Sequence, residues 1–162
     1  MDLAITRKSL QEILDQSVDH LFAHATPSCG PSGHVAYRTV HGAGCVVGRW
    51  IPPEQYRREW DEHPSGIVLC VNSLIKDPAE GAHFAAALAA NGIDVHAPHV
   101  ADLLTLLQRI YDRSHRYWYV DHEGKLHRFT TREQCLDDQL AYYVRRLPTS
   151  TLTYRRRLPR TR

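Results

Sequence analysis

The apolar residues of this chain recur at helical spacing near its amino end and again near its middle. Ser9 and Glu12 have the spacing of a capping box, and the apolar positions that follow predict a helix over residues 10–24. Pro98 precedes an apolar stripe over residues 100–111 that falls on one helical face. This second helix has the clearest pattern in the chain, and we expect it to be central to the core.

Two further helices are predicted in the second half of the sequence. An alanine-rich segment, residues 82–90, is followed by Gly92, which is typical of a helix end. Thr130 and Glu133 predict the cap of a last helix, which Pro148 ends.

Runs of β-branched and aromatic residues predict two β-hairpins. Residues 35–40 and 45–51 flank a glycine-rich turn. Residues 117–120 and 125–129 flank a second turn, in which Gly124 supplies the positive φ.

The segment between the first hairpin and the alanine-rich helix is harder to interpret. Pro52 and Pro53 end the second strand, and we expect a helix from there to about Asp61. Residues 67–75 (IVLCVNSLI) form a short apolar run, for which periodicity does not separate a buried strand from a helix. Both interpretations stay open for this run.

Length and composition indicate one domain. The chain has 162 residues, 43% of them hydrophobic and 23% charged, which is enough material for one core. We therefore predict an α+β fold, a single compact domain over residues 1–147 with two β-hairpins packed against about four or five helices.

No stretch approaches the roughly 18 to 20 apolar residues of a membrane span, and the amino end lacks the pattern of a signal peptide. We expect a cytoplasmic protein with no membrane contact, and its oligomeric state stays open.

Positive charge is concentrated at the carboxy end. Seven of the 20 lysines and arginines are arginines within residues 145–162, which contain no acid. We predict that residues 148–162 form an arginine-rich flexible tail that binds a polyanion, such as nucleic acid, or an acidic protein surface. Its candidate binding residues are Arg155, Arg156, Arg157 and Arg160.

Aromatic and basic residues alternate in the second hairpin, residues 116–129. This mixture lets bases stack while phosphates are neutralised. We expect Trp118 to be buried in the core and Tyr117 and Tyr119 to be exposed, and we add Tyr117, Tyr119 and Arg128 to the candidate binding residues.

A spaced pattern over residues 35–113 resembles a small family of uncharacterised phage and prophage proteins. It consists of a Tyr-Arg strand, a Gly-rich turn, a Cys-x-Val-Gly strand, an Ile-Pro step, a Tyr, an acidic position and a later Leu-Gln-x-Ile-x-Asp helix end. The matching positions are Tyr37, Arg38, Cys45, Val47, Gly48, Ile51, Pro52, Tyr56, Glu62, Leu107, Gln108, Ile110 and Asp112. Ala36 and Tyr111 stand where the family usually has a cysteine and a histidine. The resemblance implies an origin in a mobile genetic element and no particular reaction.

The first functional hypothesis is a non-catalytic binding protein of phage or prophage origin. It would inhibit or modulate a host protein or nucleoprotein complex, such as a defence complex in the manner of an anti-CRISPR protein, or a nucleic-acid-processing complex. A second hypothesis is a pocket that holds a nucleotide-like small molecule. Its candidate residues are Tyr37, Arg38, Trp50 and Gln108.

The third hypothesis is a small enzyme that uses a cysteine or a metal. Cys45 follows a Gly-rich turn that also contains His41, but a cysteine in a strand is usually a small buried hydrophobe. His20 and His24 could present two nitrogens to zinc, with Cys29 and His34 as completing ligands. The spacing is not that of a closed tetrahedral site, and we expect neither a metal nor another cofactor, and no catalytic residue.

Overall fold

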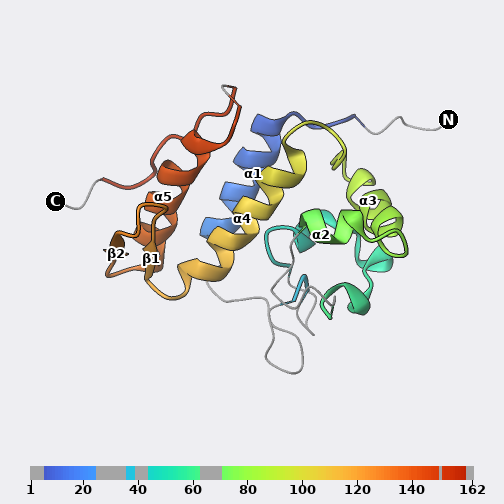
Figure 1. Cartoon of the computed structure of the whole chain (residues 1–162), viewed down its shortest axis with the longest axis horizontal. Helices are drawn as coiled ribbons and strands as arrows, with labels where there is room; N and C mark the ends of the chain where they lie inside the picture. The colour runs from blue at the N-terminus through green and yellow to red at the C-terminus, as the bar shows by residue number, and fades with distance from the viewer. Residues whose placement is uncertain (1–5, 25–35, 39–43, 63–70, 150, 160–162) are drawn as a thin grey trace.

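Five α-helices and one antiparallel β-hairpin form the regular structure of the described residues (Figure 1). The computed structural model describes residues 6–24, 36–38, 44–62, 71–149 and 151–159. The elements are α1 (Leu10–Ala23), α2 (Val71–Lys76), α3 (Gly81–Ala89), α4 (Val100–Ser114), β1 (Trp118–Val120), β2 (Leu126–Arg128) and α5 (Arg132–Tyr143). The predicted α+β class is confirmed.

Helix α4 lies at the centre, as predicted. It contacts α1 and α5 on one side and α2 on the other, and α1, α4 and α5 run side by side in Figure 1. Its apolar stripe is fully enclosed, with Leu103, Leu104, Leu107, Ile110 and Tyr111 each at most 1% exposed. No helix among the described residues is long and apolar enough to cross a membrane.

Helix α1 begins as the sequence indicates. The Ser9 hydroxyl accepts a hydrogen bond from the Glu12 N–H, and the Glu12 carboxylate accepts one from the Ser9 N–H at 2.7 Å. This reciprocal cap satisfies two backbone donors that a helix start otherwise leaves without a partner. The apolar face then packs on α4 and α5.

The first predicted hairpin is wrong in its described part. Arg38 and Gly44 form one isolated antiparallel bridge, and the chain then turns into a 3-10 helix, η1 (Gly48–Trp50). The physical reason is a close backbone approach, because a Cβ atom on Gly48 would lie 1.8 Å from the Tyr37 carbonyl oxygen. Residues 45–51 therefore fold tightly around Tyr37 and do not extend along it.

The helix predicted after Pro52 is also absent from the described residues, which form two 3-10 turns, η2 (Pro53–Gln55) and η3 (Arg58–Trp60). Pro53 forces the preceding residue into an extended conformation, and both prolines lack an N–H for a helical ladder. Trp60 anchors this segment, because its ring meets Phe84 of α3 edge-on with centroids 5.2 Å apart.

The remaining elements follow the sequence with small differences. The run 67–75 is helical where it is described, in α2, and the predicted alanine-rich helix is α3. The cap of α5 lies one residue later than expected, at Thr131 with Gln134. The second hairpin forms as predicted, with φ 81° at Gly124. A last 3-10 turn, η4 (Val144–Arg146), follows α5.

Candidate functional site

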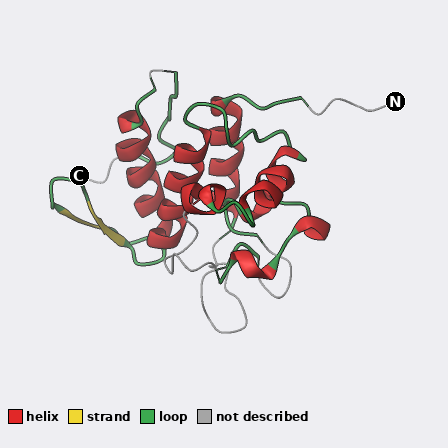
Figure 2. Ribbon diagram, turned by 45° about the vertical axis from the view of Figure 1, so that its right-hand side comes forward, coloured by secondary structure: helices red, strands yellow, loops and turns green. Residues whose placement is uncertain are grey.

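The β1–β2 hairpin lies at the edge of the helical layer, beside α5 (Figure 2). It begins just after α4 at Tyr117, whose φ of 58° is left-handed. A bulky L-residue adopts this region at a cost of about 1–2 kcal/mol. The Tyr117 carbonyl accepts a hydrogen bond from the Phe129 N–H at 2.8 Å, which closes the base of the hairpin.

Asp121 organises the hairpin tip. Its Oδ1 accepts hydrogen bonds from the backbone N–H groups of Glu123 and Lys125, both at 2.9 Å. Its Oδ2 lies 2.9 Å from Nε2 of His127. The hydrogen bond with His127 lowers the pKa of Asp121, and the two backbone hydrogen bonds lower it further. Asp121 is therefore ionised at neutral pH and fixes the turn.

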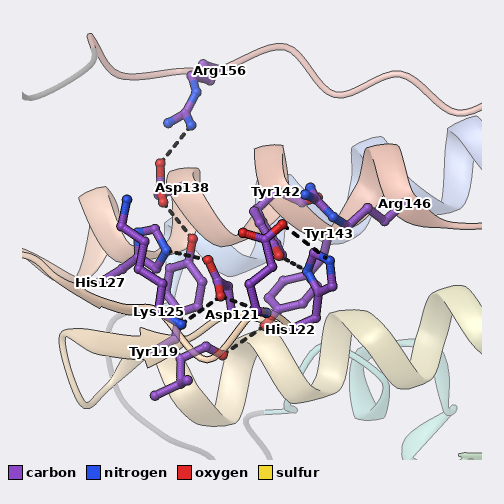
Figure 3. Close-up of polar contacts among 12 residues, drawn as sticks. Tyr119, Asp121, His122, Lys125, His127, Asp138, Tyr142, Tyr143, Arg146 and Arg156 are labelled. Atoms are coloured by element: carbon purple, nitrogen blue, oxygen red, sulfur yellow. Dashed lines mark hydrogen bonds and ion pairs between the residues drawn. The ribbon is translucent and has the colours of Figure 1, made fainter.

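The inward face of the hairpin is a stack of aromatic rings. Tyr119 is 1% exposed and lies parallel to His127 and Phe129, with ring centroids 4.7 and 6.0 Å away. Its hydroxyl donates a hydrogen bond to Asp138 of α5 at 2.7 Å (Figure 3). Burial, and then this hydrogen bond, raise the pKa of Tyr119. The hydroxyl thus remains a donor that holds β1 on α5.

A second group of contacts fixes the other end of the hairpin. Nδ1 of His122 hydrogen-bonds the Tyr142 hydroxyl, and the Tyr143 hydroxyl donates to the Val120 carbonyl at 3.3 Å (Figure 3). The Arg146 guanidinium covers the Tyr142 ring at 3.6 Å from its centroid. The hairpin is therefore anchored to α5 at both ends.

The opposite side of the hairpin carries large exposed side chains. Trp118 pairs with Arg128 across the strands, and Val120 pairs with Leu126. Trp118, Val120 and Leu126 are 41, 43 and 46% exposed, and Tyr117 at the base is 48% exposed. We define the outer hairpin face as Tyr117, Trp118, Val120, Leu126 and Arg128 together with Arg113 and Arg116 from the end of α4 and the turn that follows it.

Two hollows mark this face. The larger has a volume of about 480 Å³ and is lined by Arg116, Tyr117, Trp118, Leu126, Arg128 and Phe129. A smaller one of about 190 Å³ is lined by Arg113, Arg116, Trp118, Tyr119 and Val120. The Arg116 guanidinium lies 5.8 Å from the centroid of the Trp118 ring, within the range of a cation–π contact.

The sequence predicted part of this face correctly. Tyr117 and Arg128 are exposed as expected, but the burial of Trp118 and Tyr119 is the reverse of the prediction. The reason is that Tyr119 finds both a ring stack and a carboxylate acceptor beneath it. The sequence does carry a signal for this orientation. Side chains alternate between the two faces of a strand, and Trp118, as the cross-strand partner of Arg128, lies on the same face as that exposed arginine. The sequence pattern did not single out Arg113, Arg116, Val120 and Leu126.

The carboxy-terminal segment lies against the helices where a free arm was expected. Leu152 is 7% exposed and belongs to the core. Thr153 exchanges two backbone hydrogen bonds with the Gln11 amide of α1, both at 3.0 Å. These contacts attach residues 151–159 to the helices. The domain boundary after residue 147 stays a prediction.

Acidic side chains of α5 hold the tail arginines. Asp137 is 2% exposed, and its Oδ1 accepts hydrogen bonds from the Tyr154 hydroxyl and the Arg157 N–H, both at 2.7 Å. Arg156 pairs with Asp137 at 3.4 Å and with Asp138 at 2.7 Å. The Arg157 side chain pairs with Asp19 of α1. No local pattern indicates these pairs, whose members lie between 17 and 138 residues apart.

The tail therefore offers less free charge than predicted. Arg155 is exposed, whereas Arg156 and Arg157 are in ion pairs, and Arg160 lies outside the described residues. Burial raises the pKa of Asp138, but its hydrogen bonds with Tyr119 and Arg156 bring it below the ordinary value. Asp138 thus joins the tail to the inward face of the hairpin.

The residues of the family pattern meet beside α4. The Tyr37 N–H donates to Asp61 at 2.7 Å. The Gln108 amide accepts from the Val47 N–H at 3.4 Å and donates to Asp112 at 3.0 Å. Burial raises the pKa of Asp112 to about 7. The pattern therefore corresponds to a set of interlocked backbone and side-chain contacts.

The residues expected to hold a nucleotide-like ligand belong to this packing. Tyr37 and Gln108 are buried, and the buried Trp50 ring donates through Nε1 to the Ser17 hydroxyl at 3.3 Å. The Arg38 guanidinium donates to the Ile51 carbonyl. The structure uses these polar groups in internal contacts.

Cys45 is held in an environment opposite to that of an activated nucleophile. Its side chain is fully enclosed, and burial raises its pKa to about 12. Its sulfur accepts a hydrogen bond from the Gly48 N–H at 3.2 Å. The thiol is therefore protonated at neutral pH. His41, its expected partner, lies outside the described residues.

The histidines considered as zinc ligands make other contacts. Nε2 of His20 lies 2.8 Å from the Gly44 carbonyl, and its ring stacks on His24. Cys29 and His34 lie outside the described residues. Within the described part of the chain, no group of three or more His, Cys, Asp or Glu side chains is arranged to hold a metal ion.

Comparison of the chain with protein-family models, with curated proteins and with solved structures found no match. The candidate site therefore depends on the geometry of the outer hairpin face.

Proposed function

We propose that this protein is a non-catalytic binding protein of phage or prophage origin that modulates a host macromolecule through the outer hairpin face. The observation that carries the proposal is the two-sided construction of the hairpin. One side is fixed to α5 by buried contacts, while Trp118, Val120 and Leu126 remain more than 40% exposed on the other.

The composition of this face supports a macromolecular partner. Tryptophan, tyrosine and arginine are enriched among the residues that dominate binding energy at protein interfaces. Large apolar side chains that gather on one side of a hairpin indicate an interaction surface more often than isolated ones do. The face contains Trp118, Tyr117 and three arginines together with Val120 and Leu126.

The anchoring of the hairpin also supports a binding role. A surface that is ordered before contact loses less conformational entropy on binding. The Tyr119–Asp138 and His127–Asp121 hydrogen bonds and the Tyr142 contacts provide this order. The partner would be a defence or nucleic-acid-processing complex in the host cytoplasm.

The proposal is tested by comparing variants in capture from host lysate. The double variant Trp118→Ala/Leu126→Ala removes the centre of the face without altering the inward stack. A matched control is Arg58→Ala/Glu59→Ala, because both residues are exposed in η3, which packs beside α3. We expect the wild type and the control to retain the same host components and the hairpin variant to lose them. If the hairpin variant retained the full set, the outer hairpin face would not be the binding surface.

A further inference from the structure

We infer that the ligand of the outer hairpin face is a single-stranded nucleic acid. This inference rests on the proposed function, because it names the chemistry of the partner at the same surface. Four features of the face carry it, namely the exposed rings, the arginines beside them, the hollow between them and the backbone that presents Tyr117.

The exposed rings supply the stacking surface that unpaired bases require. Trp118 and Tyr117 are 41 and 48% exposed and follow one another at the base of β1. Stacking on aromatic side chains is the main sequence-tolerant contact of proteins that bind single strands. In a duplex the bases are already stacked on each other, so these rings favour a single strand.

Two arginines line the same hollow as the Trp118 ring. Arg116 lies 5.8 Å from the Trp118 ring centroid, and Arg128 lies directly opposite Trp118 across the strands. Proteins that bind single strands combine positive charge along the backbone path with aromatic rings on which successive bases stack. Here the arginines adjoin the Trp118 ring, which suits a polymer that alternates a base with a phosphate.

These charges are available to an external anion. Arg113, Arg116 and Arg128 are exposed, and none forms an ion pair with a carboxylate among the residues that the structure describes. Arg156 and Arg157 differ, because both are in ion pairs with acids of the body. Phosphate binding releases counterions from the strand, so unpaired arginines contribute most.

The hollow lies between the two kinds of group. Its volume of about 480 Å³ is bounded by Trp118, Leu126 and Phe129 and by the two arginines Arg116 and Arg128. Rings and aliphatic side chains can contact a base there while the arginines contact the flanking phosphates. Bases and phosphates are common to DNA and RNA, so the inference covers both polymers.

The backbone supports this assignment. Tyr117 keeps a left-handed φ of 58°, a region that glycine would occupy without cost. Strained residues of this kind are concentrated at binding and catalytic sites. In this protein the strained residue is also the most exposed ring of the face.

The inference is tested by fluorescence anisotropy with labelled oligothymidylate and oligouridylate of about 16 nucleotides, a length within the range of known single-strand sites. The full chain is used at several salt concentrations. We expect Trp118→Ala to weaken binding about fivefold or more and Trp118→Phe to restore part of it. We expect Arg116→Gln/Arg128→Gln to lower the slope of log affinity against log salt by about 1.4, since each phosphate that an arginine neutralises adds about 0.7 to the slope. Arg58→Gln, an exposed arginine in η3, should change neither quantity.

Three results would overturn the inference. The first is a wild-type protein that binds neither oligonucleotide at low salt. The second is binding that Trp118→Ala and the arginine variant leave unchanged although circular dichroism shows both to be folded. The third is equal affinity for a duplex of the same length. If the first or the second result occurred while the hairpin variant still lost its host components in lysate capture, the proposed function would stand and the ligand of this face would be a protein. With the third result the proposed function would also stand, but the ligand would be nucleic acid without a preference for single strands.

Discussion

The hairpin and the carboxy-terminal segment are both rich in arginine, but the fold uses the two groups of charges differently. In the tail, Arg156 pairs with Asp137 and Asp138, and Arg157 pairs with Asp19. In the hairpin, Arg116 and Arg128 stand beside an exposed tryptophan and pair with no carboxylate in the described part of the chain. Among the described residues, the denser charge in the sequence is thus the more strongly neutralised one.

This difference shows what local charge density leaves out. The tail has no acid within its own sequence, and its partners come from α1 and α5. An exposed ion pair contributes about 0–1 kcal/mol, but a buried carboxylate that loses its partners costs several times more. The same arginines that suggested an external polyanion therefore have a structural role.

The largest expected effect comes from ending the chain after Leu147. This change removes Leu152 from the core and leaves the carboxylate of Asp137 without its tail donors. We expect the free energy of unfolding to fall by about 4 kcal/mol, because apolar burial and hydrogen bonds to a buried charge both disappear. Urea denaturation of both chains measures it. A shortened chain as stable as the full one would show that residues 151–159 act as a free arm.

A smaller effect is expected from Asp137→Asn. The substitution keeps the size of the side chain but removes the charge that holds Tyr154, Arg156 and Arg157. We expect the free energy of unfolding, measured in the same urea experiment, to fall by about 2 kcal/mol, the contribution of hydrogen bonds to a charged group.

The matched control for that variant is Asp19→Asn, because Asp19 pairs with Arg157 at the surface, where its side chain is 70% exposed. Its effect should stay below about 0.5 kcal/mol. Equal losses of stability in the two variants would contradict the central role of Asp137.

A third prediction concerns Asp112. This carboxyl group accepts a hydrogen bond from the neutral amide of Gln108, whereas Asp137 accepts one from an arginine. Burial raises the pKa of Asp112 to about 7, above its ordinary value of 3.8. Between these values the folded protein keeps a proton that the unfolded chain releases, so this group lowers stability as pH rises from about 4 to 7. We expect Asp112→Asn to be more stable than wild type at about pH 8 and nearly equal to it at about pH 4. Identical pH profiles in thermal unfolding would exclude this role.

The sequence was sufficient for the elements that local chemistry determines. The capping box at Ser9 and Glu12 and the apolar stripe of α4 predicted two helices correctly. Gly124 predicted the turn of the hairpin. The first hairpin failed because the chain around Gly48 is shaped by contact with Tyr37, which no local pattern reveals.

The sequence predicted only part of the candidate site, because contacts between residues that are distant in sequence decide the outcome here too. The alternation of strand residues is visible in the sequence, but which side faces inward depends on what the neighbouring helix offers. Asp138 on α5 accepts the Tyr119 hydroxyl, and this contact turns Trp118 outward. The availability of each arginine likewise depends on acids that are distant in sequence.

Arginine-specific labelling with phenylglyoxal, followed residue by residue in peptide mass spectra, tests the central contrast most directly. It needs no knowledge of the partner, because it reports which guanidinium groups are free in the folded protein. Arg116 and Arg128 should react early, and Arg156, which is held between Asp137 and Asp138, should react late. Asp137→Asn should accelerate the labelling of Arg156 and leave that of Arg116 unchanged. Labelling of Arg156 in the wild type as fast as that of Arg116 would contradict this contrast between the tail and the hairpin.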